Sequence, residues 1–200
     1  MKLFQPIKIA PEIITGDEVN YTILGKRGNG KTTFSKALIK KFADEQNKVI
    51  IIFDVLNEYK GDYLFTSLSS FFEYIKVNGL HKKLSYVCSF DNQDDYSDLI
   101  TFVSQLENVF LVFEEISNFC SSYSIDENLA NIAKYGRHNN LNYLAIARRP
   151  AEINNLILSQ SHYIITFRQI LKPDIDRLMF FGFSESIREL EKFKYSWVEV

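Results

Sequence analysis

The run GKRGNGKT at residues 25–32 constrains the fold of this chain more than any other feature of the sequence. Residues 19–24 before it alternate in hydrophobicity like a β-strand, and residues 31–45 after it carry apolar side chains at helical spacing. A glycine-rich turn between a strand and a helix lies at the amino terminus of that helix. Backbone N–H groups and the helix dipole favour an anion there. The run therefore predicts a phosphate-binding loop.

The residue types of this loop indicate its ligand. Glycines allow the backbone to approach phosphates closely, and the Lys31 ammonium is expected to contact the β and γ phosphates. The hydroxyl of Thr32 can ligate Mg²⁺, so we expect ATP and Mg²⁺ as cofactors. The residues expected to bind the nucleotide are Gly25, Lys26, Arg27, Gly28, Asn29, Gly30, Lys31, Thr32 and Thr33.

Strand-like and helix-like segments alternate along the rest of the chain. The apolar runs at 49–53 and 109–113 have the composition of strands buried on both faces, as in a parallel sheet covered by helices. The alternation predicts a three-layer α/β/α sandwich with a mainly parallel central sheet, as one domain over residues 1–200. The other predicted strands are 84–90, 141–147, 163–167 and an edge strand at 195–200, and the other predicted helices are 67–77, 96–106, 126–135, 153–158, 174–180 and 185–193.

Two adjacent acids, Glu114 and Glu115, follow the apolar run 109–113. Two acids after a strand are by themselves also typical of a solvated turn. In a chain with a phosphate loop, however, we expect them to face the phosphates across the edge of the sheet. Glu114 would then hold Mg²⁺, through water, and Glu115 would orient or deprotonate the attacking water. The pair therefore predicts hydrolysis of ATP.

The composition of the chain excludes some classes of protein. A formal net charge of −2 excludes a globally basic nucleic-acid binder but leaves room for a local basic surface. The chain has no uninterrupted apolar run of about 18 residues, and its first residues are broken too soon for a secretory signal. Cys88 and Cys120 lack metal-ligand spacing and are expected to be buried thiols. These features predict a cytoplasmic protein without a membrane span.

Several motifs together resemble one known family. They are GKRGNGKT at 25–32, the strand at 50–54 continuing as NEY at 57–59, FEE at 113–115, KYGRH at 134–138, and ARRP at 147–150 followed by LSQS at 158–161. This set is similar to the HerA/FtsK superfamily of ring-forming, DNA-pumping ATPases. Within it, the chain resembles the small genome-packaging ATPases of membrane-containing viruses. The resemblance implies a RecA-like P-loop NTPase fold of the HerA/FtsK type.

The resemblance also implies roles for three further residues. Asp54 matches an acid that lies near the catalytic site in the family, although a strand-end aspartate also commonly caps a turn. Arg137 matches the arginine that enters the active site of the neighbouring subunit, unless it is a simple exposed arginine. The family often has a glutamine sensor where this chain has Arg148. Either Arg148 senses the γ phosphate directly, or Arg148 or Arg149 acts between subunits.

These observations lead to one expected function and to alternatives. We expect an ATP-hydrolysing double-stranded DNA translocase, a homo-oligomeric ring that packages a viral genome and docks on a capsid or membrane-vertex protein. It would work in the host cytoplasm or on the virion. The alternatives are a HerA/FtsK-like DNA transfer or repair ATPase, an assembly switch with little turnover, and a small P-loop kinase. A kinase lid could draw on Arg168, Arg177 and Arg188.

Overall fold

The chain forms a mixed β-sheet in the order β3-β4-β2-β5-β6-β1-β7-β8. The structure is a computed structural model that describes residues 19–45, 47–183 and 197–199. All neighbouring strands from β3 to β7 are parallel, and the edge strand β8 runs antiparallel to β7. The strands are β1 (Tyr21–Leu24), β2 (Val49–Asp54), β3 (Tyr63–Phe65), β4 (Ser85–Cys88), β5 (Val109–Glu114), β6 (Asn142–Ala147), β7 (Tyr163–Phe167) and β8 (Trp197–Glu199).

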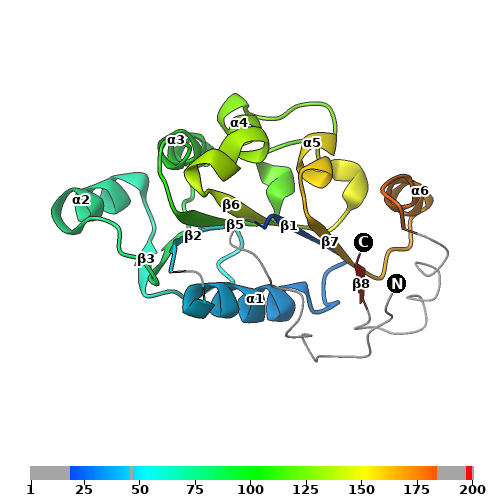
Figure 1. Ribbon diagram of the computed structural model, residues 1–200, viewed down its shortest axis with the longest axis horizontal. Helices are drawn as coiled ribbons and strands as arrows, with labels where there is room; N and C mark the ends of the chain where they lie inside the picture. The colour runs from blue at the N-terminus through cyan, green and yellow to red at the C-terminus, as the bar shows by residue number, and fades with distance from the viewer. Residues whose placement is uncertain (1–18, 46, 184–196, 200) are drawn as a thin grey trace.

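Helices cover both faces of the sheet and complete a three-layer sandwich (Figure 1). Among the described helices, only α1 lies on one face, and helices α2 to α6 lie on the opposite side. No helix in the described parts of the chain has both the length and the hydropathy to cross a membrane. The helices are α1 (Lys31–Glu45), α2 (Leu68–Asn78), α3 (Gln93–Val103), α4 (Glu127–Tyr135), α5 (Asn155–Ser159) and α6 (Lys172–Phe180), with short 3₁₀ turns η2 (Ile116–Asn118), η3 (Gly136–Asn139) and η4 (Pro150–Glu152).

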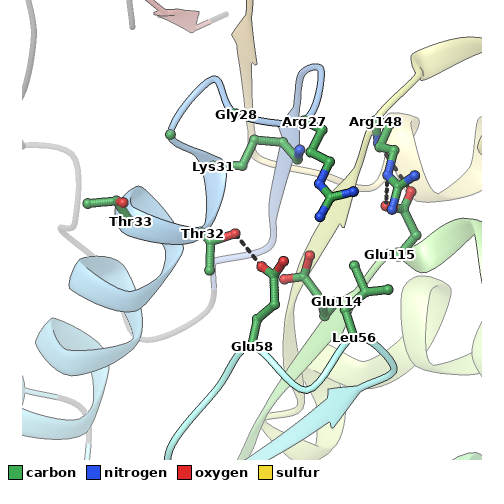
Figure 2. Close-up of a pocket in the computed structure, with 11 residues that line it drawn as sticks. Arg27, Gly28, Lys31, Thr32, Thr33, Leu56, Glu58, Glu114, Glu115 and Arg148 are labelled. Atoms are coloured by element: carbon green, nitrogen blue, oxygen red, sulfur yellow. Dashed lines mark hydrogen bonds and ion pairs between the residues drawn. The ribbon is translucent and has the colours of Figure 1, made fainter.

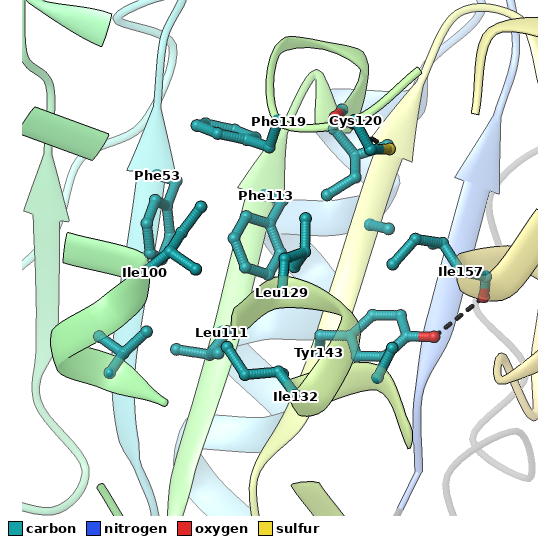
Figure 3. Close-up of a cluster of buried hydrophobic side chains, with 14 of the residues drawn as sticks. Phe53, Ile100, Leu111, Phe113, Phe119, Cys120, Leu129, Ile132, Tyr143 and Ile157 are labelled. Atoms are coloured by element: carbon teal, nitrogen blue, oxygen red, sulfur yellow. Dashed lines mark hydrogen bonds between the residues drawn. The ribbon is translucent and has the colours of Figure 1, made fainter. Parts of the chain in front are cut away.

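The two faces of the sheet carry separate hydrophobic cores because successive strand residues point to opposite sides. In β5, Phe110 and Val112 pack in the core beneath α1, whereas Leu111 and Phe113 pack in the larger core beneath α3, α4 and α5 (Figure 3). Burial on both faces requires an uninterrupted apolar run, which is the pattern that the sequence shows at residues 109–113. Cys88 and Cys120 are buried as free thiols, as predicted.

The predicted fold class is confirmed, and most element boundaries agree within a few residues. The exception is β3, a strand that the sequence did not predict. It has three residues, and Leu64 at its centre is exposed, so it lacks both the length and the buried alternation that mark a strand. β8 occupies part of the edge strand predicted at 195–200, whereas the helix predicted at 185–193 lies outside the described residues.

The larger core predicts a stability effect at Phe113. This ring is fully buried, stacks on Phe53 at 4.5 Å between centroids, and meets Phe119 edge-on at 5.6 Å. Phe113→Ala should lower the free energy of unfolding by about 3–5 kcal/mol, because it removes a buried ring and leaves a cavity. Urea unfolding measures this. The control is Tyr123→Ala, since Tyr123 is 98% exposed. A loss of stability in Phe113→Ala as small as that in Tyr123→Ala would contradict the packing of Phe113 in the larger core.

Candidate active site

A polar pocket lies at the carboxyl edge of the parallel sheet, where the strands end and the glycine-rich loop begins (Figure 2). Its volume is about 520 Å³. Four segments that are distant in the sequence meet there: the loop, the turn after β2, the end of β5 and the end of β6. The lining residues are Arg27, Gly28, Gly30, Lys31, Thr32, Thr33, Leu56, Glu58, Glu114, Glu115 and Arg148.

Three residues of the predicted nucleotide-binding set shape the loop and do not line the pocket. Gly25 packs so closely on Phe167 that a Cβ at this position would lie 2.6 Å from the Phe167 Cβ, and its N–H donates to the Ala147 carbonyl. The Asn29 amide donates to the Arg168 carbonyl at 3.2 Å. The Lys26 carbonyl accepts the N–H of Asn29. These contacts anchor the base of the loop to β6 and β7.

Lys31 at the start of α1 directs its charge into the loop. Its side chain is largely buried, and Nζ donates to the Lys26 carbonyl at 3.3 Å. Burial lowers the pKa of Lys31, while the carboxylates of Glu115 and Glu114 act in the opposite direction. An added phosphate would counteract the effect of burial, raise the pKa of Lys31 and favour its ammonium form. The position therefore suits a cation that meets phosphate oxygens.

Glu114 ends β5 with its carboxylate almost completely buried. Oε2 accepts a hydrogen bond of 2.7 Å from the Tyr59 hydroxyl, which also shares a hydrogen bond of 2.6 Å with Ser35 on α1. Burial raises the pKa of Glu114 to about 7, although the Tyr59 hydrogen bond lowers it. Neither Tyr59 nor Ser35 could be assigned a role from the sequence, because their relation to Glu114 exists only in the folded chain.

Glu58 lines the pocket, although the sequence analysis assigned it no role beyond its place in the NEY motif at 57–59. Its Oε2 accepts a hydrogen bond of 2.8 Å from the Thr32 hydroxyl (Figure 2). The Lys36 ammonium donates to the Glu58 carbonyl and holds this part of the turn against α1. Glu58 thus meets the hydroxyl for which we predicted a role in metal binding.

Oxygen donors of the kind that Mg²⁺ prefers gather in this pocket: the Thr32 hydroxyl and the carboxylates of Glu58 and Glu114. In the described parts of the chain, no three His, Cys, Asp or Glu side chains form a metal site by themselves. Mg²⁺ is commonly held by one or two carboxylates together with waters and substrate phosphates. The donor set therefore fits a magnesium ion that arrives with a nucleotide.

Glu115, the second acid of the pair, contacts Arg148 at the end of β6. Glu115 Oε2 lies 2.8 Å from Arg148 Nε, and Oε1 accepts the Arg148 backbone N–H at 3.3 Å. Glu115 adopts a left-handed backbone conformation with φ 57° and ψ 66°, which non-glycine residues rarely adopt. This turn directs its side chain toward Arg148 and the pocket (Figure 2).

Asp54 lies at the same edge of the sheet but does not line the pocket. Its buried carboxylate accepts the backbone N–H groups of Glu58 at 3.0 Å and Tyr59 at 2.8 Å. It therefore caps the turn that carries these two residues, which is the alternative that the sequence left open for a strand-end aspartate.

Arg137 lies at the opposite end of the strands from the pocket. It lies exposed on η3, immediately before β6 begins, so it is at the amino edge of the parallel strands. A smaller polar cavity there is lined by Lys134, Arg137 and His162, among others. Arg137 cannot contribute to the pocket of its own chain from this position.

Of the arginines considered for a kinase lid, Arg168 and Arg177 do not line the pocket either. Arg177 donates to the Ile153 carbonyl and to Asn155, and so ties α6 to the segment after η4. The Arg168 carbonyl is used by Asn29 of the loop. Arg188 lies outside the described residues.

Residues 20–158 match the family model described as the central domain of the helicase HerA. The chain belongs to this family. The match covers more than half of the chain and includes the loop, both acids and Arg148. The predicted resemblance is therefore confirmed, and the chain is a P-loop ATPase of the HerA and FtsK group. Among curated proteins, none matches the chain significantly by sequence.

Solved structures share the fold at low sequence identity. The genome packaging NTPase B204 from Sulfolobus turreted icosahedral virus 2, in complex with ATP-gammaS, is 18% identical, with a TM-score of 0.71 and 90% of each chain covered. B204 from Sulfolobus turreted icosahedral virus, a DNA-packaging ATPase, is 15% identical, with a TM-score of 0.68 and 93% of each chain covered. The cytoplasmic domain of EssC is 15% identical, with a TM-score of 0.56, 84% of this chain covered and 34% of EssC.

The burial of Glu114 predicts a pH effect on stability. Its pKa is about 7 in the folded protein and near 4.5 for a solvated carboxyl, so between these values the folded chain holds a proton that the unfolded chain releases. The free energy of unfolding should therefore fall as the pH rises from about 4.5 to 7, by about 3 kcal/mol from this group.

Chemical unfolding without metal or nucleotide, at pH values from 4.5 to 8, measures this effect against Glu114→Gln. The variant cannot titrate at this position, so the difference in stability between the two proteins should change with pH by the stated amount. A difference that is constant with pH would contradict the raised pKa.

Proposed function

We propose that this protein hydrolyses ATP to translocate double-stranded DNA, and that it serves as a viral genome-packaging motor. The observation that carries the proposal is the pocket itself, where the phosphate loop faces Glu114, Glu115 and Arg148. The likeness to B204 over nearly the whole of both chains supports packaging, since that protein is a genome packaging NTPase. Residues 1–200 would act as a single motor domain.

Nucleotide binding would rest on the loop and the first turn of α1. The N–H groups from Arg27 to Thr33 would surround the phosphates, and Lys31 would neutralise charge on the β and γ groups. Thr32, Glu114 and Glu58 would hold Mg²⁺, directly or through water. The ion, when bound, supplies positive charge to the phosphate oxygens. Tyr59 would orient Glu114 for this role through its hydrogen bond.

Glu115 would act as the general base of hydrolysis. Its position one residue beyond Glu114 and its left-handed turn bring the carboxylate to the pocket wall across from Lys31. A carboxylate there can orient a water and accept its proton as the water attacks the γ phosphorus. Arg148 would sense the γ phosphate within the same subunit, because it lines this pocket.

Arg137 would complete the active site of a neighbouring subunit. Its position at the amino edge of the sheet excludes it from its own pocket and leaves its side chain exposed to a neighbour. A guanidinium supplied in trans would stabilise charge on the transferring phosphoryl group. Such a shared site requires a ring in which each subunit presents its amino edge to the pocket of the next.

The ring would surround double-stranded DNA and dock on a capsid or membrane-vertex protein, in the host cytoplasm or on the virion. A formal net charge of −2 per chain is compatible with DNA binding in a ring, because a few basic residues per subunit add up around a central pore.

The first test measures ATP hydrolysis with and without double-stranded DNA, together with the molecular mass under the same ATP and Mg²⁺ conditions. We expect DNA to raise the rate several-fold in particles of ring-sized mass, and Lys31→Ala to abolish turnover through loss of phosphate binding. A hydrolysis rate that DNA does not change would argue for an assembly switch. Transfer of phosphate to a small acceptor by a monomer would argue for a kinase. A DNA-stimulated ring that binds no capsid or vertex protein would favour DNA transfer or repair.

A second test addresses the shared active site. Arg137→Ala and Glu115→Gln should each bind ATP with near-normal affinity and lose most turnover, because one lacks the trans arginine and the other the base. Mixed subunits should regain part of the activity, since some interfaces then combine an intact Glu115 with an intact Arg137. Activity that stays absent at every mixing ratio, in rings of normal mass, would remove the role in trans.

A further inference from the structure

We propose that the polar cavity at the amino edge of the sheet binds the γ phosphate of the ATP held by a neighbouring subunit, and that Lys134 and His162 contact this phosphate together with Arg137. The cavity has a volume of about 240 Å³ and lies at the opposite end of the strands from the nucleotide pocket. This inference rests on the proposed function, which assigns Arg137 to the neighbour, and adds two further contacts in trans.

The cavity has the charge of an anion-binding site. Two of its lining side chains, Lys134 and Arg137, are cationic, and none of the described residues that line it is acidic. Within the described parts of the chain, neither side chain forms an ion pair or a hydrogen bond, whereas Arg148 and Arg149 each pair with a carboxylate. The two positive charges are therefore available to an anion from outside the subunit.

The turn from α4 into η3 places both cations on the same wall. Lys134 is in the last turn of α4, and Arg137 follows three residues later in η3, a spacing that puts two side chains on one side of a helix. Gly136 permits this turn, because a Cβ there would lie 2.9 Å from the Leu141 carbonyl oxygen. The Gly136 carbonyl also accepts the Leu141 N–H at 2.8 Å. The base of the Arg137 side chain is thereby fixed just before β6.

His162, between α5 and β7, provides a neutral donor. Its Nδ1 accepts the backbone N–H of Asn20 at 3.0 Å, and the His162 backbone N–H donates to the Asn20 carbonyl at 2.9 Å. In a neutral imidazole one nitrogen accepts and the other carries the proton, so the proton of His162 lies on Nε2. Because His162 lines the cavity, Nε2 can donate to an anion bound there.

The segment that carries His162 is tied to the sheet. The Asn20 side chain donates to the Gln160 carbonyl at 3.2 Å and accepts the Tyr143 N–H at 3.1 Å, so it joins this segment to β6. The Ser161 hydroxyl lies 2.7 Å from the Thr22 hydroxyl of β1. This part of the cavity is therefore formed before a ligand binds, which reduces the entropy lost on binding.

A terminal phosphate fits this set of donors. It has three oxygens, and the parallel N–H groups of one guanidinium bind two of them, so an ammonium and an imidazole N–H can bind the remainder. In the proposed ring, the edge that carries Arg137 faces the pocket of the next subunit. The same edge then brings Lys134 and His162 to that nucleotide, because all three residues line one cavity.

The first measurement is the steady-state rate of ATP hydrolysis by variants of the full chain. Lys134→Ala should lower kcat by about tenfold or more, the effect of a lost charged hydrogen bond. KM should stay within about twofold, because the loop that binds ATP belongs to the other subunit of the interface and is intact.

Two changes at His162 separate its donor from its structural contact. His162→Asn keeps an acceptor for the Asn20 N–H but loses the donor at the Nε2 position, and should lower kcat by about fivefold. His162→Gln retains a donor at that position and should recover most of the rate. His138→Ala is the matched control and should leave kcat unchanged, since His138 is exposed on η3 and does not line the cavity.

Mixed rings distinguish a contact in trans from a defect within one subunit. Lys134→Ala mixed with Glu115→Gln should hydrolyse ATP faster than either variant alone, because some interfaces then combine an intact base with an intact cavity. Lys134→Ala mixed with Arg137→Ala should show no gain, since every cavity then lacks one cation. A defect in the folding of Lys134→Ala would not depend on the partner in this way.

An unchanged kcat in Lys134→Ala or in His162→Asn would overturn the proposal. A normal rate without DNA together with a weaker response to DNA would also overturn it, because the cavity would then bind a DNA phosphate. Activity regained by Arg137→Ala with Glu115→Gln, but not by Lys134→Ala with Glu115→Gln, would exclude Lys134 from the contact in trans. If neither mixture regains activity, or if the wild-type chain does not hydrolyse ATP, the proposed function itself is rejected.

Discussion

The pocket depends on the parallel pairing of four central strands. β1 pairs with β6, β6 with β5 and β5 with β2, and the registers align Leu24 with Ala147, Ala145 with Phe113, and Glu114 with Asp54. Parallel strands end at a common edge, so the segments that follow them must meet there. The phosphate loop, Arg148, the acidic pair and the turn after β2 converge for this reason. The apolar cores on both faces hold the registers, because a slip by one residue would exchange the side chains that are packed in the two cores.

The buried acidic groups at this edge each have a hydrogen-bond or ion-pair partner. Asp54 caps the turn of Glu58 and Tyr59, Tyr59 donates to Glu114, and Glu115 pairs with Arg148. An unpaired charge in such a position would be strongly destabilising. The same contacts couple the acids to their neighbours, so that a change in the charge of one acid alters the electrostatic environment of the groups around it.

Several parts of the site followed from the sequence because they depend on local chemistry. The loop and the helix after it are contiguous, and glycine, lysine and threonine at that spacing have few other uses. The acidic pair was recognisable because it directly follows an apolar strand. By contrast, Glu58 and Tyr59 belong to the NEY motif at 57–59 but could not be given roles from the sequence, since their hydrogen bonds to Thr32 and Glu114 join segments 26 and 55 residues apart. The short strand β3 escaped prediction because pairing with β4, and not its own pattern, makes it a strand.

The sequence by itself determined the class of fold, the phosphate loop and the presence of two acids at a strand end, because hydrophobic periodicity and glycine chemistry act over neighbouring residues. The tertiary structure alone decided which residue each side chain meets. It assigned Asp54 to a turn, separated Arg137 from the pocket of its own chain, and distinguished Arg148 from Arg149 although they are adjacent in the sequence. The physical reason is that hydrogen bonds and ion pairs depend on distances between atoms, and strand order and register set those distances across the sheet.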